Sequence, residues 1–280
     1  MHQATLAKPI KIEGQGLHTG KRTTLTLYPA EPNSGISFLR IDQKPPVRIE
    51  AKLENVVSSN RCVSLGKGEI VVNTVEHLLA ALWGMGIDNA LIEIDDEEVP
   101  ALDGSASVFV SMIKESGIVK FEEKKRIANL KETLWVHKGE AHILAIPAPR
   151  LRITYLVDYN HNHASEQIGS FIINQEVFEK EIAPARTFGF DYELEELLKN
   201  GFALGGSLEN AILITENGPV TPLRFEDELV RHKILDLIGD LSLIGLYPNC
   251  HIIAIKASHN LHLELGRKLI SVFNRRCQLV

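Results

Sequence analysis

The pattern of hydrophobic and polar residues predicts short strands near the N-terminus and helices after them. Apolar runs of strand length, which Pro, Asn and Gly residues separate, fall at 24–28, 36–41 and 70–72. The next segment, 75–85, is almost wholly apolar and is predicted to form a helix that Asn73 or Thr74 caps and glycines end. A helix that is apolar on every side is typical of a protein interior. We therefore expect this helix to be buried.

A second series of elements repeats part of the first. A strand at 89–94 and an amphipathic helix at 106–116 complete the first half, and the charged stretch 121–126 looks like a linker. Beyond it the pattern predicts strands at 143–147, 151–159 and 171–174, helices at 177–181, 191–198 and 228–243, a strand at 251–257 and a helix at 261–274. The last three of these elements repeat the earlier order of helix, strand and helix. This order favours the α+β class and two structurally duplicated halves, although no residue-level repeat accompanies it.

The chain length is compatible with two domains of ordinary size. At 280 residues we predict an N-terminal α+β domain over 1–123 and a C-terminal α+β domain over 127–280. If the halves are duplicates, His77 and His232 lie on corresponding helices and meet between them. Ligand and active sites often lie at interfaces of this kind.

Composition and charge narrow the class of protein. With 44% hydrophobic and 24% charged residues the chain is typical of globular proteins, and a net charge of -6 without a long basic run argues against nucleic-acid binding. The three cysteines, Cys62, Cys250 and Cys277, are widely spaced and indicate free thiols in a reducing compartment. Residues 1–8 contain no apolar core typical of a signal peptide, and no apolar run is long enough to span a bilayer. We expect a cytoplasmic monomer without stable membrane insertion.

One helix face carries three titratable residues. His232, Asp236 and Asp240 recur every four residues on the predicted helix 228–243, and the residues around them are apolar. Burying such a stripe is costly unless the charges are compensated, and a divalent cation compensates a His and an Asp one turn apart. The alternative is a solvated face with a simple His–Asp hydrogen bond. The apolar surroundings favour a metal site.

A catalytic zinc needs three protein ligands, so a further donor must come from elsewhere in the chain. His77 is the candidate, because it lies on the apolar helix 75–85, and its neighbour Glu76 is then placed to take a proton from the attacking water. His259 follows a strong apolar strand, in a turn where side chains often reach into a site. We interpret the remaining histidines considered as surface or strand residues: His2, His18, His137, His142, His251 and His262.

Two glycine-rich segments do not support nucleotide chemistry. In residues 14–20, Thr19 stands where a dinucleotide fingerprint needs its third glycine, so we predict a turn. In residues 201–207, Ser207 stands where a phosphate-binding loop needs its lysine.

Four motifs together resemble the UDP-3-O-acyl-N-acetylglucosamine deacetylase family, whose members are zinc amidases of lipid A biosynthesis, and they occur in the same order as in that family. The motifs are Thr74-Val75-Glu76-His77, Leu102-Asp103-Gly104-Ser105, Ala185-Arg186-Thr187-Phe188 and the run from Arg231 to Asp240. The resemblance extends from about residue 12 to residue 259. It implies a two-domain α/β sandwich with a small insert in each half and a zinc ion, or alternatively Fe²⁺, held between the halves.

The resemblance also implies a role for each matching residue. His77, His232 and Asp236 are the implied zinc ligands, Glu76 the general base and His259 the general acid, with Asp240 orienting His259 and the Thr187 hydroxyl stabilising the oxyanion. The implied substrate is UDP-3-O-acyl-N-acetylglucosamine, which would be hydrolysed to acetate and a free amine. The positions implied or considered for substrate contacts are Lys233 and Lys256 for the diphosphate, Tyr159 for the uracil, Phe188, and Gly206 at the acyl passage.

The chain departs from the family pattern at two positions. Ser258 stands before His259 where the family has glycine, and Leu229 follows Glu228 where proline is common. Cys62 lies in a loop where some members place a cysteine near the metal, and it stays unassigned.

Two other functions remain open for the sequence. Two histidines and a carboxylate also bind iron in non-haem oxygenases, although here the ligands lie on apolar helices. A closed metal site in a binding protein is the other alternative, in which Glu76 and His259 only orient the ligands.

Overall fold

A computed structural model describes residues 1–162 and 164–277 of the chain, and its first half forms a five-stranded sheet. The strand order is β2-β3-β9-β4-β5, and only β4 and β9 run parallel. The strands are β2 (Ile10–Gln15), β3 (Arg22–Pro29), β4 (Ile36–Arg40), β5 (Val47–Glu50) and β9 (Ala90–Ile94). Buried and partly exposed residues alternate along β3 and β9, so one face of the sheet packs on the interior.

The second half repeats this sheet strand for strand. Its order is β12-β13-β19-β14-β15, and again only the third and fourth strands in this order, β19 and β14, run parallel. The strands are β12 (Leu134–Lys138), β13 (Ala141–Pro147), β14 (Arg152–Val157), β15 (Gln167–Ile172) and β19 (Tyr247–Ile255), to which β11 (Ile127–Asn129) adds a short parallel pairing. The repeated topology confirms the α+β class and shows the duplication that the order of elements predicted.

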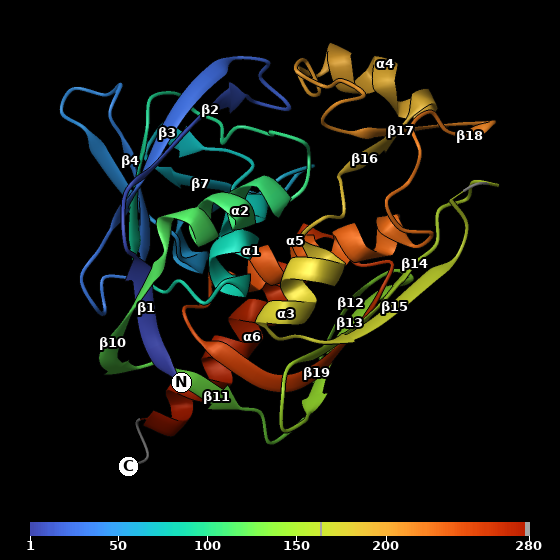
Figure 1. The fold of residues 1–280 in the computed structure, drawn as a ribbon. Helices are drawn as coiled ribbons and strands as arrows, with labels where there is room; N and C mark the ends of the chain where they lie inside the picture. The colour runs from blue at the N-terminus through green and yellow to red at the C-terminus, as the bar shows by residue number, and fades with distance from the viewer. Residues whose placement is uncertain (163, 278–280) are drawn as a thin grey trace.

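Each half contributes two helices to the space between the sheets. In the first half these are α1 (Glu76–Gly84) and α2 (Ser107–Ser116), and in the second half α5 (Glu228–Ser242) and α6 (His259–Cys277). Figure 1 shows the four helices in the middle, with one sheet on each side. Eight of the nine residues of α1 are buried, as the all-apolar pattern predicted.

A small insert extends from each half toward the same side of the molecule. The first contains the 3₁₀ turn η1 (Leu53–Asn55), β6 (Val56–Ser58), β7 (Ser64–Lys67) and β8 (Ile70–Val72). The second contains β16 (Phe188–Phe190), α4 (Asp191–Lys199), β17 (Ile212–Thr215) and β18 (Gly218–Pro219). An ion pair between Arg61 of the first insert and Glu193 of the second, 3.3 Å apart, joins the two inserts.

Several local predictions were wrong. Most of the expected linker 121–126 lies in β10 (Ile118–Lys124), which pairs with the N-terminal strand β1 (His2–Leu6), because alternate residues of a charged edge strand can face solvent. The strand expected at 171–174 is β15, which ends at Ile172. The helix expected at 177–181 is split into α3 (Gln175–Val177) and a π-helical turn (Phe178–Ile182).

The expected cap of α1 was also wrong. Thr74 has a positive φ of 57° and its hydroxyl donates to the buried carboxylate of Glu98, 2.8 Å away, and Val75 occupies the N-cap position without a side-chain cap. Glu98 also accepts from the backbone N–H groups of His18 and Thr19. The predicted turn is therefore confirmed for residues 17–19, whereas residues 14 and 15 belong to the end of β2.

Cys62 and Cys250 are free thiols, as expected, and the thiol of Cys277 lies outside the described residues. Among the described helices none combines the length and the apolar character that crossing a membrane requires. The domain limits of 1–123 and 127–280 stay a prediction.

Candidate metal centre and active site

The two central helices, α1 and α5, approach each other closely at Gly239. A Cβ atom at this position would lie 2.1 Å from the carbonyl oxygen of Glu76, so only glycine allows the observed distance between the helices. This contact brings the start of α1, with Glu76 and His77, against the polar face of α5. The site is therefore built at the interface between the duplicated halves.

His77, His232 and Asp236 offer ligand atoms to one point between the helices. One atom from each residue lies within 4.8 Å of the others, and all three residues are buried. The Oδ1 atom of Asp236 lies 3.3 Å from Nε2 of His232 and 3.5 Å from Nε2 of His77. Two imidazoles and one carboxylate in this arrangement are a donor set that zinc accepts, and they leave room for a fourth ligand from outside the protein.

In His232 and Asp236, the atoms that do not face the other donors form hydrogen bonds with neighbouring groups. Nδ1 of His232 lies 3.1 Å from the carbonyl oxygen of Ala185, which can only accept, so Nδ1 carries the proton and Nε2 is left to bind an ion. Lys233 donates to Oδ2 of Asp236 at 2.7 Å, so Oδ1 remains for the ion. The structure thus places the Lys233 ammonium, expected at the diphosphate, on a predicted metal ligand.

The protonation states of two donors, His232 and Asp236, fit a metal centre. Burial lowers the pKa of the third, His77, but Asp236 and Glu76 outweigh burial and raise it in the absence of an ion. Burial lowers the pKa of His232 to about 4 despite the opposing pull of Asp236, so its ring is neutral near pH 7. Burial alone would raise the pKa of Asp236, but Lys233 and His232 outweigh it and hold the pKa well below its usual range. Asp236 is therefore ionised, as a carboxylate ligand must be.

Glu76 lies beside the three donors without belonging to them. Its side chain is 3% exposed, and Oε2 accepts a hydrogen bond from the N–H of Val63 at 3.1 Å. Burial raises the pKa of Glu76 above its ordinary value, although His259 and His77 oppose the shift. A carboxylate with a raised pKa next to a candidate metal site is suited to accept and release a proton.

His259 lies on the other side of the same space. Its Nε2 is 3.9 Å from both Oε1 of Glu76 and Oδ2 of Asp236, while its Nδ1 is 2.7 Å from Oδ2 of Asp240. Burial lowers the pKa of His259, but the Asp240 carboxylate outweighs burial and raises the pKa to about 9. An imidazolium near pH 7 can donate a proton from Nε2.

The structure corrects the prediction for His262. It was expected to be a surface or strand residue, yet it is fully buried on α6 and its Nδ1 shares Oδ2 of Asp240 with His259, at 2.8 Å. Its Nε2 lies 3.0 Å from the hydroxyl of Tyr155, which donates to the carbonyl of Ala257. The spacing of three residues from His259, on one helix face, was the signal that could have identified it.

Two of the residues expected to contact substrate, Phe188 and Tyr159, lie beside His232, and Thr187, expected at the oxyanion, precedes Phe188 in the chain. Phe188 packs edge-on against the His232 ring, with centroids 6.0 Å apart, and against Tyr159 at 5.4 Å. Thr187 precedes Phe188, and its N–H donates to the carbonyl of Gly104 at 2.8 Å. Burial raises the pKa of Tyr159 to about 12, so its hydroxyl stays protonated.

Two other residues expected to contact substrate, Lys256 and Gly206, lie in loops. Lys256 has a positive φ of 50° and pairs with Asp158 at 2.8 Å. Gly206 is exposed in the second insert, where the neighbouring Gly205 packs against the backbone of Gly16 and Gly20 in the first half.

Sequence comparisons agree with the architecture. Residues 3–271 match the family model of UDP-3-O-acyl N-acetylglycosamine deacetylase, LpxC. The chain is similar to proteins named UDP-3-O-acyl-N-acetylglucosamine deacetylase from Nostoc sp., with 45% identity over 98% of this chain and 100% of the relative, and from Thermodesulfovibrio yellowstonii, with 47% identity over 96% and 91%. A third relative of that name, from Syntrophotalea carbinolica, is 44% identical over 97% of this chain and 88% of its own length. The chain therefore belongs to the UDP-3-O-acyl-N-acetylglucosamine deacetylase family.

Proposed function

We propose that the protein hydrolyses the acetamide of UDP-3-O-acyl-N-acetylglucosamine to acetate and UDP-3-O-acyl-glucosamine, the committed step of lipid A biosynthesis. The observation that carries the proposal is the meeting of His77, His232 and Asp236 between the two halves, with Glu76 and His259 beside them. The names of the relatives supply the substrate. The free thiols of Cys62 and Cys250 agree with the expected cytoplasmic location.

His77, His232 and Asp236 would hold the metal ion, for which zinc is the first candidate and Fe²⁺ the second. When bound, the ion supplies a Lewis acid for the acetamide carbonyl and lowers the pKa of a coordinated water. The protein holds two of the donors ready for it, because Ala185 fixes the His232 ring and Lys233 occupies the outer oxygen of Asp236.

Glu76 acts as the general base in this proposal. Its Oε2 is tied to Val63, so the carboxylate has a fixed orientation, and the other oxygen, Oε1, is on the side of His259. Its raised pKa makes it a better proton acceptor than an exposed glutamate. Attack of water on the acetamide carbonyl would transfer one proton to Glu76.

His259 acts as the general acid. Departure of the glucosamine nitrogen requires a proton, and Nε2 of His259 faces the centre while Nδ1 is held by Asp240. Asp240 stabilises the positive charge of the His259 imidazolium, and this charge is neutralised when His259 donates its proton. Thr187, whose N–H donates to the carbonyl of Gly104, would donate a hydrogen bond from its hydroxyl to the oxyanion and keep its proton.

The substrate would extend from this centre along the second insert. Tyr159 and Phe188 form an aromatic wall next to His232 that suits the uracil or the sugar face. Lys256 is proposed to bind the diphosphate. The Lys233 ammonium already donates to Asp236, so it can bind the diphosphate only if it contacts both groups. Gly206, which is exposed in the second insert, is proposed for the passage of the acyl chain.

The test is acetate release from UDP-3-O-acyl-N-acetylglucosamine under nitrogen. We compare metal-replete protein, protein stripped by a chelator, and stripped protein given zinc again. Release that needs no oxygen, disappears on stripping and returns with zinc supports a metal-dependent deacetylase. Folded, metal-bound protein that releases no acetate refutes the proposal, and a closed binding site or an oxygenase then remains.

Three variants separate the roles in the same assay. Glu76→Ala should keep its metal and lose about 10²–10⁴-fold in turnover, because a general base contributes that much. His232→Ala should lose both metal and turnover. Glu264→Gln, which changes an exposed carboxylate of α6, is the control that should leave both unchanged. Full activity in Glu76→Ala would exclude the proposed base.

A further inference from the structure

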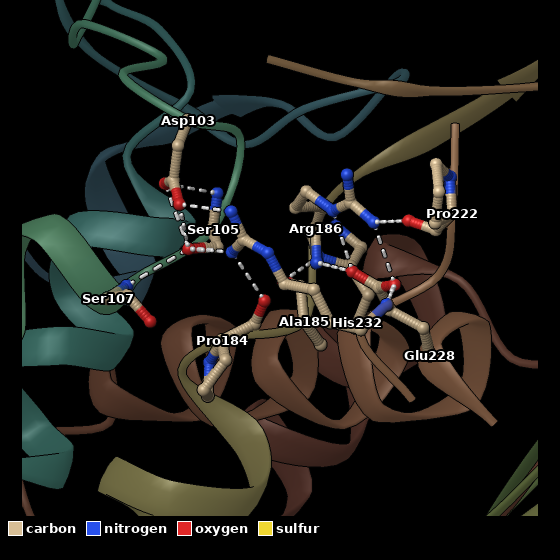
Figure 2. Close-up of polar contacts among 10 residues, drawn as sticks. Asp103, Ser105, Ser107, Pro184, Ala185, Arg186, Pro222, Glu228 and His232 are labelled. Carbon is tan, nitrogen blue, oxygen red and sulfur yellow. Dashed lines mark hydrogen bonds and ion pairs between the residues drawn. The ribbon is translucent and has the colours of Figure 1, made fainter. Parts of the chain in front are cut away.

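Glu228 is a buried carboxylate that the proposed reaction does not use. It lies in the first turn of α5, one turn before His232, and its side chain is 0% exposed. Each of its oxygens accepts two hydrogen bonds. Oε1 accepts from the backbone N–H and Nε of Arg186, at 3.0 and 2.9 Å, and Oε2 accepts from Nη2 of Arg186 at 3.1 Å and from the backbone N–H of Arg224 at 2.6 Å. Figure 2 shows this buried pair beside His232.

The carboxylate holds a segment that touches the metal centre. In residues 184–186, three successive residues are each fixed by a polar contact: the carbonyl of Pro184 accepts from Arg224 at 2.8 Å, the carbonyl of Ala185 faces Nδ1 of His232, and the N–H of Arg186 donates to Glu228. The Ala185 carbonyl therefore has little freedom to turn away from His232. Its direction decides which nitrogen of the His232 ring carries the proton.

The same network reaches the first half of the chain. Arg224 donates to Oδ2 of Asp103 at 2.9 Å and to the hydroxyl of Ser105 at 3.3 Å. Between these two residues, Gly104 accepts the N–H of Thr187. A Cβ at Gly104 would lie 1.9 Å from the carbonyl oxygen of Asn210, and its φ of +77° also favours glycine. The Leu102-Asp103-Gly104-Ser105 motif thus positions the segment on which Ala185 and Thr187 lie.

We propose that Glu228 is a positioning residue for the metal centre, acting through Arg186 and the carbonyl of Ala185 on His232. The inference rests on the proposed function, because it assumes that Nε2 of His232 binds the ion. Glu228 holds the 184–186 segment in register with its own helix, so that Nδ1 of His232 remains the donor and Nε2 remains free. Positioning contacts of this kind typically change metal affinity by about 10–100-fold.

Glu228→Gln tests the proposal with almost no change in size. The amide presents one acceptor and one donor, so two of the four N–H groups that now donate to Glu228 would face another donor. We expect zinc affinity, measured by competition with a chromophoric chelator, to fall about 10–100-fold while far-UV circular dichroism is unchanged. The visible spectrum of the Co²⁺ form should also change, because the geometry at His232 changes. Unchanged affinity and an unchanged Co²⁺ spectrum would overturn the proposal.

Asp227→Asn is the matched control. Asp227 lies next to Glu228 and pairs with Arg231 at 2.5 Å, but among the described residues it forms no hydrogen bond or ion pair with the 184–186 segment. It should lower stability without changing zinc affinity. If Glu228→Gln fails to fold, Arg224→Gln removes only the partly exposed side chain that holds Pro184 and Asp103, and it should weaken zinc binding in the same direction. Wild-type affinity in that variant would then overturn the proposal.

A double variant distinguishes positioning from charge balance. Arg186→Met with Glu228→Met removes both charges but leaves the N–H at position 186 without its acceptor. Positioning predicts that zinc affinity stays low, whereas recovery to the wild-type value would show that only an unpaired charge had mattered and would overturn the proposal. Failure of the proposed function gives a different result, since wild-type protein would then bind no zinc or release no acetate.

Discussion

Replacing Gly239 by alanine tests whether the contact between α1 and α5 sets the geometry of the site. The added Cβ would lie 2.1 Å from the carbonyl oxygen of Glu76 and 3.0 Å from its Cα. An ordinary C···O contact needs about 3.3 Å, so the helices must separate by roughly 1 Å. Both neighbours are backbone atoms, so no side-chain rotation relieves the contact. Glu76 and His77 move with α1, and His232 and Asp236 stay with α5.

The expected loss is larger for activity than for stability. Overpacking costs about 1–3 kcal/mol, whereas alanine in a helix interior regains about 1 kcal/mol over glycine. A displacement of about 1 Å in a catalytic arrangement costs about 100-fold in rate. We therefore expect kcat/KM for acetate release to fall about 100-fold and the unfolding free energy to fall by no more than about 2 kcal/mol.

Gly266→Ala is the matched control, because it is also a glycine in a helix of the core. Its Cβ would lie 3.1 Å from Cγ2 of Ile244 and 3.2 Å from Cδ1 of Leu53, which are the movable ends of side chains. The control should keep its kcat/KM and unfold at the same or a slightly higher temperature. Wild-type kcat/KM in Gly239→Ala would show that the helix contact does not set the site.

Three further predictions concern the groups around the centre. Asp240 raises the pKa of His259 to about 9, and a general acid must be protonated, so activity falls as the pH rises through that pKa. Asp240→Asn should move this loss of kcat/KM to lower pH, and a pH profile that stays unchanged would contradict the role of Asp240. His262→Leu leaves Asp240 and the Tyr155 hydroxyl each one buried partner short, and should lower the unfolding free energy by about 1–3 kcal/mol in urea titrations. Chelation should lower the thermal midpoint and zinc should restore it, because an ion present at 1,000 times its Kd stabilises the folded state by about 4 kcal/mol; an unchanged midpoint would argue against these donors as a tight site.

The elements that the sequence predicted well are those with a strong period or an all-apolar pattern. The helices at 75–85 and 228–243 are α1 and α5 within two residues at each end. The first is apolar on every side, and the second has apolar residues around titratable residues at helical spacing. The short strands β16 and β18 were missed, since two or three residues carry no period and their pairing comes from distant segments. Strand β10 was mistaken for a linker because its exposed positions are charged.

Some residues of the candidate site could likewise be predicted from the sequence, and others could not. His232, Asp236 and Asp240 could be grouped from the sequence because helical spacing alone places them on one face. His77 could be added because it lies on a similarly apolar helix, and the predicted duplication of the halves, which the topology of the two sheets supports, placed it opposite His232.

Glu228 was not identified because its role depends on Arg186, 42 residues away, which no local pattern connects to it. His262 was missed although it lies three residues after His259, and its partner Asp240 is 22 residues away. The two residues act on opposite ends of the same helix. Glu228 lies one turn before His232, and His262 holds Asp240, two turns after it, so the polar face of α5 is held at both ends by residues outside the metal-binding set. A helix whose ligands must stay fixed while Glu76 and His259 exchange protons benefits from such contacts, because each constrains a side chain or a carbonyl that the ligands themselves cannot constrain. Residues that carry the chemistry can thus be recognised by type and spacing, whereas residues that position them become visible only in the folded chain.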